Sequence, residues 1–449
     1  TNFTWSGATD TDWNDPSNWQ DGYTPDCSID ISIPSVTNHP IIDATTEISV
    51  DNLTINSGAT LTIEGGLTVE GDLTTNDGLT INSGGSLIVN GTSTGNLTYN
   101  RNIPVAKKWY QISPPVSGET IENYISNNSL QTGNGNVGLY YYDNSTALGF
   151  LGTGYIFYTP SSTGGFVAGR GYGTQVSSAS NVTFTGTMPT ADVGITVATG
   201  TIDNSNLVGN PFPSYLPANT NANADNLLTN NTGVLSEETL WIWDNTINDY
   251  VAINNASAAT YVAPAQSFFV DGSGSGTFNM NESWQSHQST DVFYKNTNKI
   301  SSIKLTIKNL QNEIKSTEIY FYNNKTIGFD NGFDSSQLPS GSNLNIYTRL
   351  INSPSNAIKL AIQTLPKEKI INDIKSNLST SSVALLKKKL PHFYQIYLEV
   401  FPTTSELEII KETLLQNKNV RKVEVFYKNH NQTYLLLVLL STISFILFF

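Results

Sequence analysis

The clearest pattern in the chain is an alternation of apolar and polar residues over 46–100. Apolar residues recur there in pairs two positions apart, and glycine or Asn-Ser-Gly separates one pair from the next. A period of two puts both members of a pair on one face of a strand. The pairs are Ile48/Val50, Leu53/Ile55, Leu61/Ile63, Leu67/Val69, Leu79/Ile81 and Leu87/Val89.

Short strands joined by small polar turns predict a parallel β-solenoid over 46–100. The segment INSGATLTI (55–63) returns as INSGGSLIV (81–89), a shift of 26 residues. One rung cannot bury its apolar pair alone, so stacked rungs form the core. A meander of β-hairpins shows the same alternation and is the alternative. In a solenoid, an aspartate in place of Leu61 buries an unpaired charge and destabilises the fold.

The N-terminal segment 1–45 is rich in tryptophan. Trp5, Trp13 and Trp19 lie among Asn, Asp, Gly and Pro, which are turn-forming residues. Large aromatic side chains between turns indicate a compact piece held together by ring packing. We therefore expect 1–45 to form a cap on the solenoid.

Residues 101–290 also favour β structure. Many short runs of β-branched and aromatic residues, such as VGLYYYD and TLWIWD, are separated by Gly, Asn and Ser. This spacing is typical of an all-β sandwich. Helical periodicity is confined to ETIENYIS (119–126). Residues 291–365 continue with strand-like runs and predict a small β module.

The period changes in 366–433, which predicts a small α+β module. A strand is expected over 393–401 and another over 420–427. Between them, Thr403 and Glu406 have the spacing of a helix-capping box, and an apolar stripe follows. The module therefore combines two strands with at least one helix.

The C-terminal run 434–449 holds sixteen residues without a charge. As a helix it would span about 24 Å, at about 1.5 Å per residue, against a hydrocarbon core of roughly 30 Å. We interpret it as a truncated transmembrane helix, which would bring the chain to a membrane. A buried core helix is the alternative.

Composition also changes along the chain, between about residues 300 and 367. Residues 1–300 hold 26 acidic and 6 basic residues, whereas 301–449 hold 11 acidic and 17 basic residues. All 34 glycines lie before Lys367. We therefore expect 1–365 and 366–449 to fold as independent units without a shared core, in a chain that is an artificial or a natural fusion.

The overall composition excludes several classes of protein. With 13% charged and 10% aromatic residues, the chain is not disordered as a whole. A net charge of −14 excludes a generally basic nucleic-acid binder. The one cysteine, Cys27, permits no internal disulfide, and no Cys/His zinc pattern exists. No HExxH, GxSxG or P-loop motif is present. We therefore predict neither an enzyme nor a cofactor.

One loop has the spacing of a calcium site. Asp10, Asp12, Asn14 and Asp21 stand at positions 1, 3, 5 and 12 of a loop, and Ca²⁺ prefers such oxygen ligands. Position 6, however, is Asp15 instead of the glycine that the sharp turn requires. Asx turns and caps are the alternative.

Trp241 and Trp243 are candidates for carbohydrate binding. Standing two positions apart in a strand, they share one face. If exposed, they form a platform on which sugar rings stack; if buried, they are core aromatics. Acidic residues nearby could form a glycosidase pair, although acidic residues are common throughout 1–300. These residues are Glu237, Glu238, Asp244 and Asp249.

Several segments of 1–365 resemble large secreted surface proteins of Bacteroidetes that leave the cell by the type IX route. This resemblance implies a β-rich protein at the cell surface or outside the cell, often adhesive, with no catalytic residues to transfer. The family's β-sandwich sorting domain is missing here. The segments are TWSGATDTDWNDPSNW (4–19), NLTINSGATLTI (52–63), LTINSGGSLIVNGT (79–92), KWYQISPPVSGETIENYI (108–125), NLVGNPFPSYL (206–216) and YVAPAQSFFV (261–270).

The tail resembles a different family. Residues 385–440, from LLKKKLPHFYQIYLEV to NQTYLLLVLL, are similar to the end of the extracytoplasmic domain of the cell-division protein FtsX and the start of a membrane helix. The resemblance implies an inner-membrane protein that passes a signal from a cytoplasmic ATPase to peptidoglycan hydrolases outside. The other membrane helices of that family are absent.

Taken together, these features predict a non-enzymatic extracellular surface protein that functions in adhesion or scaffolding. Its partners would be surface glycans or other cells, through many weak contacts on the β faces. One alternative is a polysaccharide-active enzyme or a carbohydrate-binding module centred on Trp241 and Trp243. Another is an FtsX-like cell-division membrane protein.

Overall fold

The computed structural model divides the chain into two compact units. The N-terminal unit contains 1–298 and 331–338, and the C-terminal unit contains 299–330 and 339–449. The described residues are 2–145, 153–288, 302–308, 314–320, 325–326, 328–338, 346–347, 393–398, 422–427 and 434–439.

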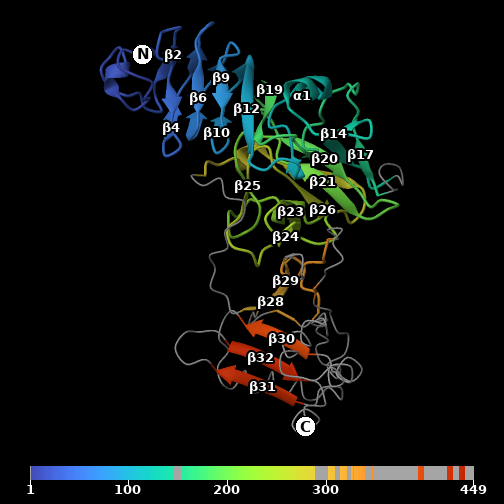
Figure 1. Cartoon of the computed structure of the whole chain (residues 1–449). Helices are drawn as coiled ribbons and strands as arrows, with labels where there is room; N and C mark the ends of the chain where they lie inside the picture. The colour runs from blue at the N-terminus through green and yellow to red at the C-terminus, as the bar shows by residue number, and fades with distance from the viewer. Residues whose placement is uncertain are drawn as a thin grey trace, which may run out of the picture. The chain divides into compact units, whose positions relative to one another are not determined.

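The N-terminal unit begins with a parallel β-solenoid built from three sheets (Figure 1). The first sheet has the order β1 (Asn2–Thr4), β2 (Asp30–Ile33), β5 (Leu53–Ile55), β8 (Leu73–Thr74) and β11 (Ser93–Thr94). The second has the order β10 (Ser86–Val89), β7 (Gly66–Val69) and β4 (Glu47–Val50). The third contains β3 (Ile41–Ile42), β6 (Leu61–Ile63), β9 (Leu79–Ile81) and β12 (Asn96–Ile103).

The solenoid prediction is confirmed, and the apolar pairs form its core. Leu61 pairs with Leu79, and Leu79 pairs with Leu97, so identical side chains stack from turn to turn. All the predicted pair members are buried, except that Ile48 is only partly buried against the same core. The polar residues between the pair members point away from this core, which is what a period of two requires.

The 26-residue sequence repeat is not the structural repeat. One turn takes 20 residues along the first sheet, from Leu53 to Leu73, and 18 along the third, from Leu61 to Leu79. The repeated INSG motifs follow β5 and β9, which lie in different sheets. A shift of 26 residues is therefore one turn plus one side of the solenoid.

The solenoid also starts earlier than predicted. Strands β1, β2 and β3 lie within 1–45 and already pair in parallel with the later turns. Trp5, Trp13 and Trp19 are buried, and the centroids of the Trp13 and Trp19 rings lie 4.8 Å apart. The tryptophan segment is thus a loop of the first turn that closes the end of the core, and η1 (Pro16–Asn18) lies within it.

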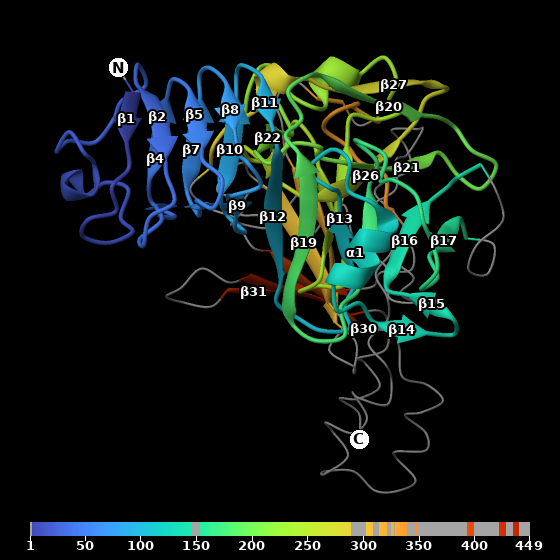
Figure 2. The same cartoon turned by 90° about the horizontal axis from the view of Figure 1, so that it is seen from above.

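The solenoid shares its core with β19 (Ser180–Thr187), α1 (Ile121–Asn127) and the first of the sheets that follow it. Strand β12 pairs in parallel with β9 and, on its other edge, antiparallel with β19 along its full length (Figure 2). Buried Tyr124, Tyr172 and Phe184 belong to the same apolar cluster as the solenoid leucines. The predicted boundary at 100/101 therefore does not separate two cores.

Two four-stranded antiparallel sheets follow the solenoid, and side chains of both meet in a further apolar cluster with Tyr140, Leu207, Trp241 and Phe269 at its centre. One sheet has the order β13 (Tyr110–Ile112), β18 (Tyr172–Thr174), β16 (Leu139–Tyr142) and β17 (Tyr155–Phe157). The other has the order β21 (Ser205–Gly209), β26 (Ser267–Asp271), β23 (Leu240–Asp244) and β24 (Asp249–Ile253).

Shorter elements complete this unit. The helical prediction at 119–126 is confirmed by α1 (Ile121–Asn127), where the Thr120 hydroxyl caps the first turn by accepting from the Asn123 N–H. The remaining strand pairs are β14 (Thr132–Gly133) with β15 (Asn136–Val137), β20 (Val193–Val197) with β27 (Gly276–Met280), and β22 (Leu216–Pro217) with β25 (Tyr261–Val262). The 3₁₀ turns are η3 (Thr229–Asn231) and η4 (Glu282–Trp284).

The described part of the C-terminal unit is made of strands. Strands β28 (Ser302–Lys308) and β29 (Ile314–Tyr320) form an antiparallel pair. A second sheet has the order β30 (Phe393–Leu398), β32 (Tyr434–Leu439) and β31 (Lys422–Tyr427). The strands predicted at 393–401 and 420–427 are found as β30 and β31, and the predicted helix after Thr403 lies outside the described residues.

The helix predicted for 434–449 differs from the structure in its first part. Residues 434–439 form β32, the central strand, which is hydrogen-bonded to β30 and β31 on its two edges. A short apolar run has no periodicity that separates a central strand from a helix, and here strand pairing decides. Residues 440–449 lie outside the described part. Among the described residues, no helix is long and apolar enough to cross a membrane.

The expected boundary at 365/366 does not coincide with the division between the two units. Strand β28 belongs to the C-terminal unit and contacts β30, although the two strands lie on opposite sides of residue 365. Residues 331–338 belong instead to the N-terminal unit. Composition thus marks a change in the chain that strand packing does not follow.

Candidate functional site

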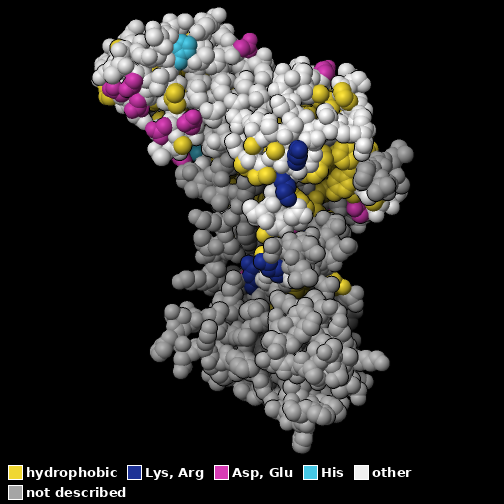
Figure 3. All heavy atoms as spheres, viewed as in Figure 1, with side chains coloured by type: hydrophobic (Ala, Val, Ile, Leu, Met, Phe, Trp, Pro, Cys, Tyr) yellow, Lys and Arg dark blue, Asp and Glu magenta, His cyan; other side chains and the backbone are white. Residues whose placement is uncertain are grey.

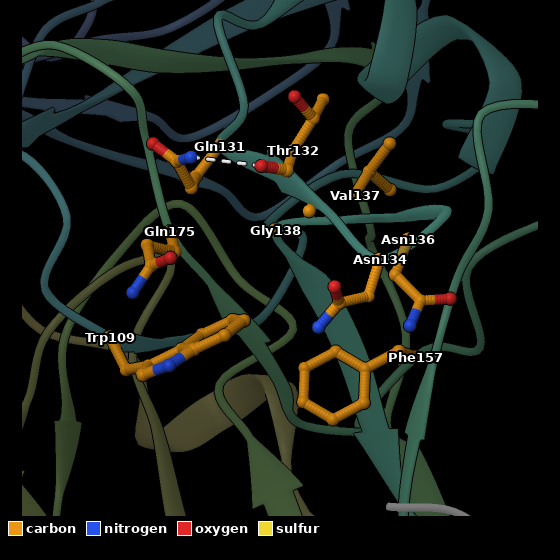
Figure 4. A pocket seen from close by; sticks show the side chains of 10 residues that line it. Trp109, Gln131, Thr132, Asn134, Asn136, Val137, Gly138, Phe157 and Gln175 are labelled. Atoms are coloured by element: carbon orange, nitrogen blue, oxygen red, sulfur yellow. Dashed lines mark hydrogen bonds between the residues drawn. The ribbon is translucent and has the colours of Figure 1, made fainter.

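A hollow of about 170 Å³ opens beside the first four-stranded sheet, lined by aromatic and amide side chains. The rings of Trp109 and Phe157 lie at one end, and Gln131 and Thr132 lie at the other (Figure 4). The lining is completed by Gly133, Asn134, Asn136, Val137, Gly138 and Gln175. No ionisable side chain is among these residues, so the hollow is polar without being charged.

A tight hairpin builds one wall of the hollow. Strands β14 and β15 are joined by Asn134 and Gly135, whose φ angles are +52° and +79°. An Asn-Gly pair with positive φ at both positions is the preferred two-residue hairpin turn. The turn places the Asn134 and Asn136 side chains along the same side of the hollow (Figure 4).

Backbone hydrogen bonds hold the floor of the hollow in place. The Gly138 N–H donates to the Gln131 carbonyl at 2.6 Å, and the Gln175 N–H donates to the Gly138 carbonyl at 2.8 Å. A Cβ on Gly138 would stand 2.2 Å from the Gln175 carbonyl oxygen, so only glycine fits this close approach. The hollow is therefore formed by paired backbone segments of the sheet.

The aromatic end of the hollow packs against a buried tyrosine, Tyr140. The Trp109 ring centroid lies 5.0 Å from that of buried Tyr140 and 5.6 Å from that of Phe157. Both Trp109 and Phe157 remain half-buried. Burial raises the pKa of the Tyr140 phenol, which therefore stays neutral. Figure 3 shows hydrophobic side chains gathered where β17 lies in Figure 1.

Several polar groups of the hollow have unused hydrogen-bonding capacity. Within the described residues, no hydrogen bond is formed by the Trp109 indole N–H or by the side-chain amides of Asn134 and Asn136. The Gln131 amide donates to the Thr132 carbonyl at 2.9 Å and keeps its own oxygen available (Figure 4). Each free amide offers both donors and an acceptor to a ligand.

Of the two tryptophans proposed for sugar stacking, Trp241 is not accessible. Its side chain is 1% exposed, and its indole N–H donates to the Ser336 carbonyl at 3.1 Å. Trp243 is half-buried, packs edge-on against Tyr250 and donates to the Asn245 side chain. The alternation correctly put both side chains in one strand, but Trp241 is a core aromatic and cannot serve as a platform.

The acidic residues near Trp241 hold a segment of the chain in place. Glu237 accepts hydrogen bonds from the backbone N–H and the hydroxyl of Ser336. Burial raises the pKa of Glu237, and the bonds from Ser336 oppose this shift. Glu238 accepts from the side-chain amides of Asn255 and Asn331. These two carboxylates therefore fix 331–338 against the second four-stranded sheet.

The other two acidic residues near Trp241 cap turns. The Asp244 carboxylate accepts from the Thr246 N–H at 2.7 Å, and the Asp249 carboxylate accepts from the Tyr250 N–H at 2.9 Å. Both bonds are local and satisfy backbone donors. The structure thus gives each candidate glycosidase carboxylate a structural partner.

Two of the predicted calcium ligands, Asp10 and Asp12, form Asx turns. The Asp10 carboxylate accepts from the Asp12 N–H at 2.9 Å, and the Asp12 carboxylate accepts from the Asn14 N–H at 2.9 Å. The bond from the Asp12 N–H, together with one from the Asn18 side-chain amide, lowers the pKa of Asp10. Asp21 lies exposed. Among the described residues, no three acidic, His or Cys side chains are grouped so that they could hold a metal ion.

The sequence analysis did not identify the hollow. Its lining comes from segments near 109, 131–138, 157 and 175, which no local pattern brings together. One usable signal existed, since Asn134-Gly135 between two Gly/Asn-flanked strands predicts a tight hairpin. That signal places an exposed turn but does not show which aromatic side chain lies next to it.

Comparisons with known proteins give one family. A family model described as "Domain of unknown function (DUF8693)" matches residues 4–373. The match covers the solenoid and the two four-stranded sheets, and it ends close to the compositional change at 366. No curated protein and no solved structure matches the chain.

Proposed function

The chain belongs to the DUF8693 family, and we propose that it is a non-enzymatic extracellular surface protein that functions in adhesion or scaffolding. The observation that carries the proposal is the continuous core that joins the solenoid to the first four-stranded sheet, β19 and α1. A shared core makes this part of the N-terminal unit one stiff body, because packed interiors transmit strain instead of bending. A stiff body with long β faces suits repeated weak contacts.

The outer surface of the solenoid supports the same proposal. The Glu70 carboxylate accepts from Ser49 at 2.8 Å and from Asn90 at 2.7 Å, and so connects three successive turns. Asn52 donates to Asp30 at 2.7 Å on another corner. These uncharged and acidic side chains recur on successive turns of the solenoid, so its outer surface is polar.

Localisation and adhesion can be tested separately. Intact cells of the source organism are treated with proteinase K, and the chain is followed by immunoblotting. We expect it to be cleaved on intact cells, whereas protection until lysis would contradict a surface location. Beads coated with the full chain should then bind cells from the same habitat more than beads coated with heat-denatured chain, and equal binding would contradict adhesion.

A second candidate function is carbohydrate binding, and the Trp109 hollow is the observation that favours it. The test that separates a binding protein from a polysaccharide-active enzyme is incubation of the full chain with soluble polysaccharides. We expect retention in affinity electrophoresis without any increase in reducing ends. Release of reducing ends would favour the enzyme.

A further inference from the structure

We propose that the Trp109 hollow binds the terminal residue of a neutral glycan. This inference rests on the proposed adhesive function and names the ligand chemistry of one site. Its starting point is that aromatic faces and free amides meet in one hollow, with Trp109 and Phe157 at one end and Asn134 and Asn136 along the side (Figure 4).

The chemistry of the lining matches a sugar ring. A pyranose presents C–H groups on its faces, which pack on aromatic rings, and hydroxyls on its edge, which both donate and accept hydrogen bonds. The half-buried rings of Trp109 and Phe157 supply the apolar contact. The polar contacts come from the side-chain amides of Asn134 and Asn136 and from the Trp109 N–H, since none of these groups forms a hydrogen bond within the described residues.

The size of the hollow selects one sugar residue. Its volume of about 170 Å³ is roughly ten times the 10–15 Å³ that a single water requires. It is smaller than the roughly 300–1,000 Å³ of pockets that enclose a drug-sized ligand. A single ring therefore fits, with the rest of the glycan extending into solvent.

The absence of charge in the lining selects a neutral sugar. Hexoses and N-acetylhexosamines leave no ionised group to be compensated, whereas a uronate or sialate would need a cation. The exposed lysines Lys107 and Lys108 adjoin this region in sequence but are not among the lining residues. These two lysines could pair with a carboxylate, so binding of an acidic sugar is the outcome that competes with the proposal.

The rigid floor argues for a preformed site. The Gln131, Gly138 and Gln175 backbones are hydrogen-bonded to one another, and the hairpin turn holds Asn134 in a left-handed conformation. Little ordering is needed on binding, so weak affinity for one residue is sufficient when many copies of the chain act together.

The test uses the full chain and a glycan array, followed by titration with glucose, galactose, mannose, N-acetylglucosamine and glucuronate. We expect at least one neutral sugar to bind, with affinity at least tenfold weaker in Trp109→Ala and severalfold weaker in Asn136→Ala. Trp109→Phe keeps a ring against Tyr140 and should retain part of the binding. Asn134→Asp keeps a residue that tolerates the left-handed turn while replacing the amide by a carboxylate.

Trp243→Ala is the matched control, because it removes a half-buried tryptophan that does not line the hollow. It should leave sugar affinity unchanged. Circular dichroism and denaturation midpoints must show that each variant is folded. The site would be overturned if neutral sugars bind equally well to the wild type and to Trp109→Ala, Trp109→Phe and Asn136→Ala. The proposed adhesion by the full chain would stand in that case.

Two further outcomes would also overturn the inference. Binding of glucuronate alone, lost in a Lys107→Ala/Lys108→Ala variant, would assign an acidic ligand. Binding of the full chain to cells or beads that excess free monosaccharide does not reduce would assign another surface or a polypeptide partner. If the full chain binds neither glycans nor cells, the proposed adhesive function fails as well.

Discussion

The stacked core of the solenoid can be tested by truncating one buried leucine, Leu61. Leu61 is 0% exposed and stacks on Leu79 of the next turn. Its N–H donates to the Gly78 carbonyl at 2.9 Å, and the Thr62 N–H donates to the Pro40 carbonyl at 3.1 Å. Because backbone bonds tie β6 to the strands on both sides, the chain cannot collapse into a cavity left by Leu61→Ala.

The expected cost follows from that rigidity. Leu→Ala substitutions in packed cores cost about 2–5 kcal/mol, and the cost is greatest where the surroundings do not relax. We therefore expect Leu61→Ala to lower the free energy of unfolding by about 3–4 kcal/mol. With a denaturant slope of about 3 kcal/mol per molar urea, the unfolding midpoint should fall by about 1 M. Leu61→Asp should be more damaging, since it buries an unpaired charge.

Tryptophan fluorescence during urea denaturation is the suitable assay. All seven tryptophans lie between Trp5 and Trp284, so the signal reports the N-terminal unit. Thr62→Ala is the matched control, because Thr62 is the outward neighbour of Leu61 in the same strand and forms no side-chain hydrogen bond within the described residues. Equal midpoints for Leu61→Ala and Thr62→Ala would refute the inward stacking of β6.

Three other predictions follow from buried polar groups. Burial lowers the pKa of His287 below its ordinary 6.5, and the charge of Glu47 opposes this shift. The contribution of neutral His287 to stability should therefore be complete above pH 6.5 and be lost as the pH falls below it. The urea midpoints of the wild type and of His287→Gln should accordingly converge at low pH. Asn18→Ala removes the acceptor for the Thr9 and Asp10 N–H groups and should cost about 1–3 kcal/mol, measured by the same fluorescence assay; an unchanged midpoint would contradict it. Glu237→Ala should increase hydrogen exchange at residues 331–338, and unchanged protection would show that Glu237 does not hold this segment.

Local pattern predicted the strands well because strand periodicity is a property of neighbouring residues. The alternation over 46–100 identified the inward side chains of β4, β5, β6, β7, β9 and β10, and helical periodicity identified α1 within two residues. The same local information could not give the 18- to 20-residue turn of the solenoid. That spacing depends on which strands stack, whereas the 26-residue repeat reflects similar turns on different sides.

The candidate site shows even more clearly which features local sequence patterns cannot predict. Trp109, the Asn134 turn and Phe157 are separated in sequence, and only the pairing of β13, β18, β16 and β17 brings their segments together. Trp241 and Trp243 had the better sequence signal, yet residues 331–338 and the second sheet cover Trp241. A side chain's exposure depends on the remote segments that lie over it, and no local pattern contains them.

The sequence by itself therefore determined the strands, the apolar faces of the solenoid and the Asn-Gly hairpin, because each depends on dihedral preferences and spacing within a few residues. Tertiary structure decided the rest. It merged the solenoid and the first four-stranded sheet into one core through β12 and β19, buried Trp241, left Trp109 half-buried and made a strand of the apolar residues 434–439. Each of these outcomes depends on pairing between segments that are distant in sequence. Such pairing contributes free energy only when the folded chain brings those segments together.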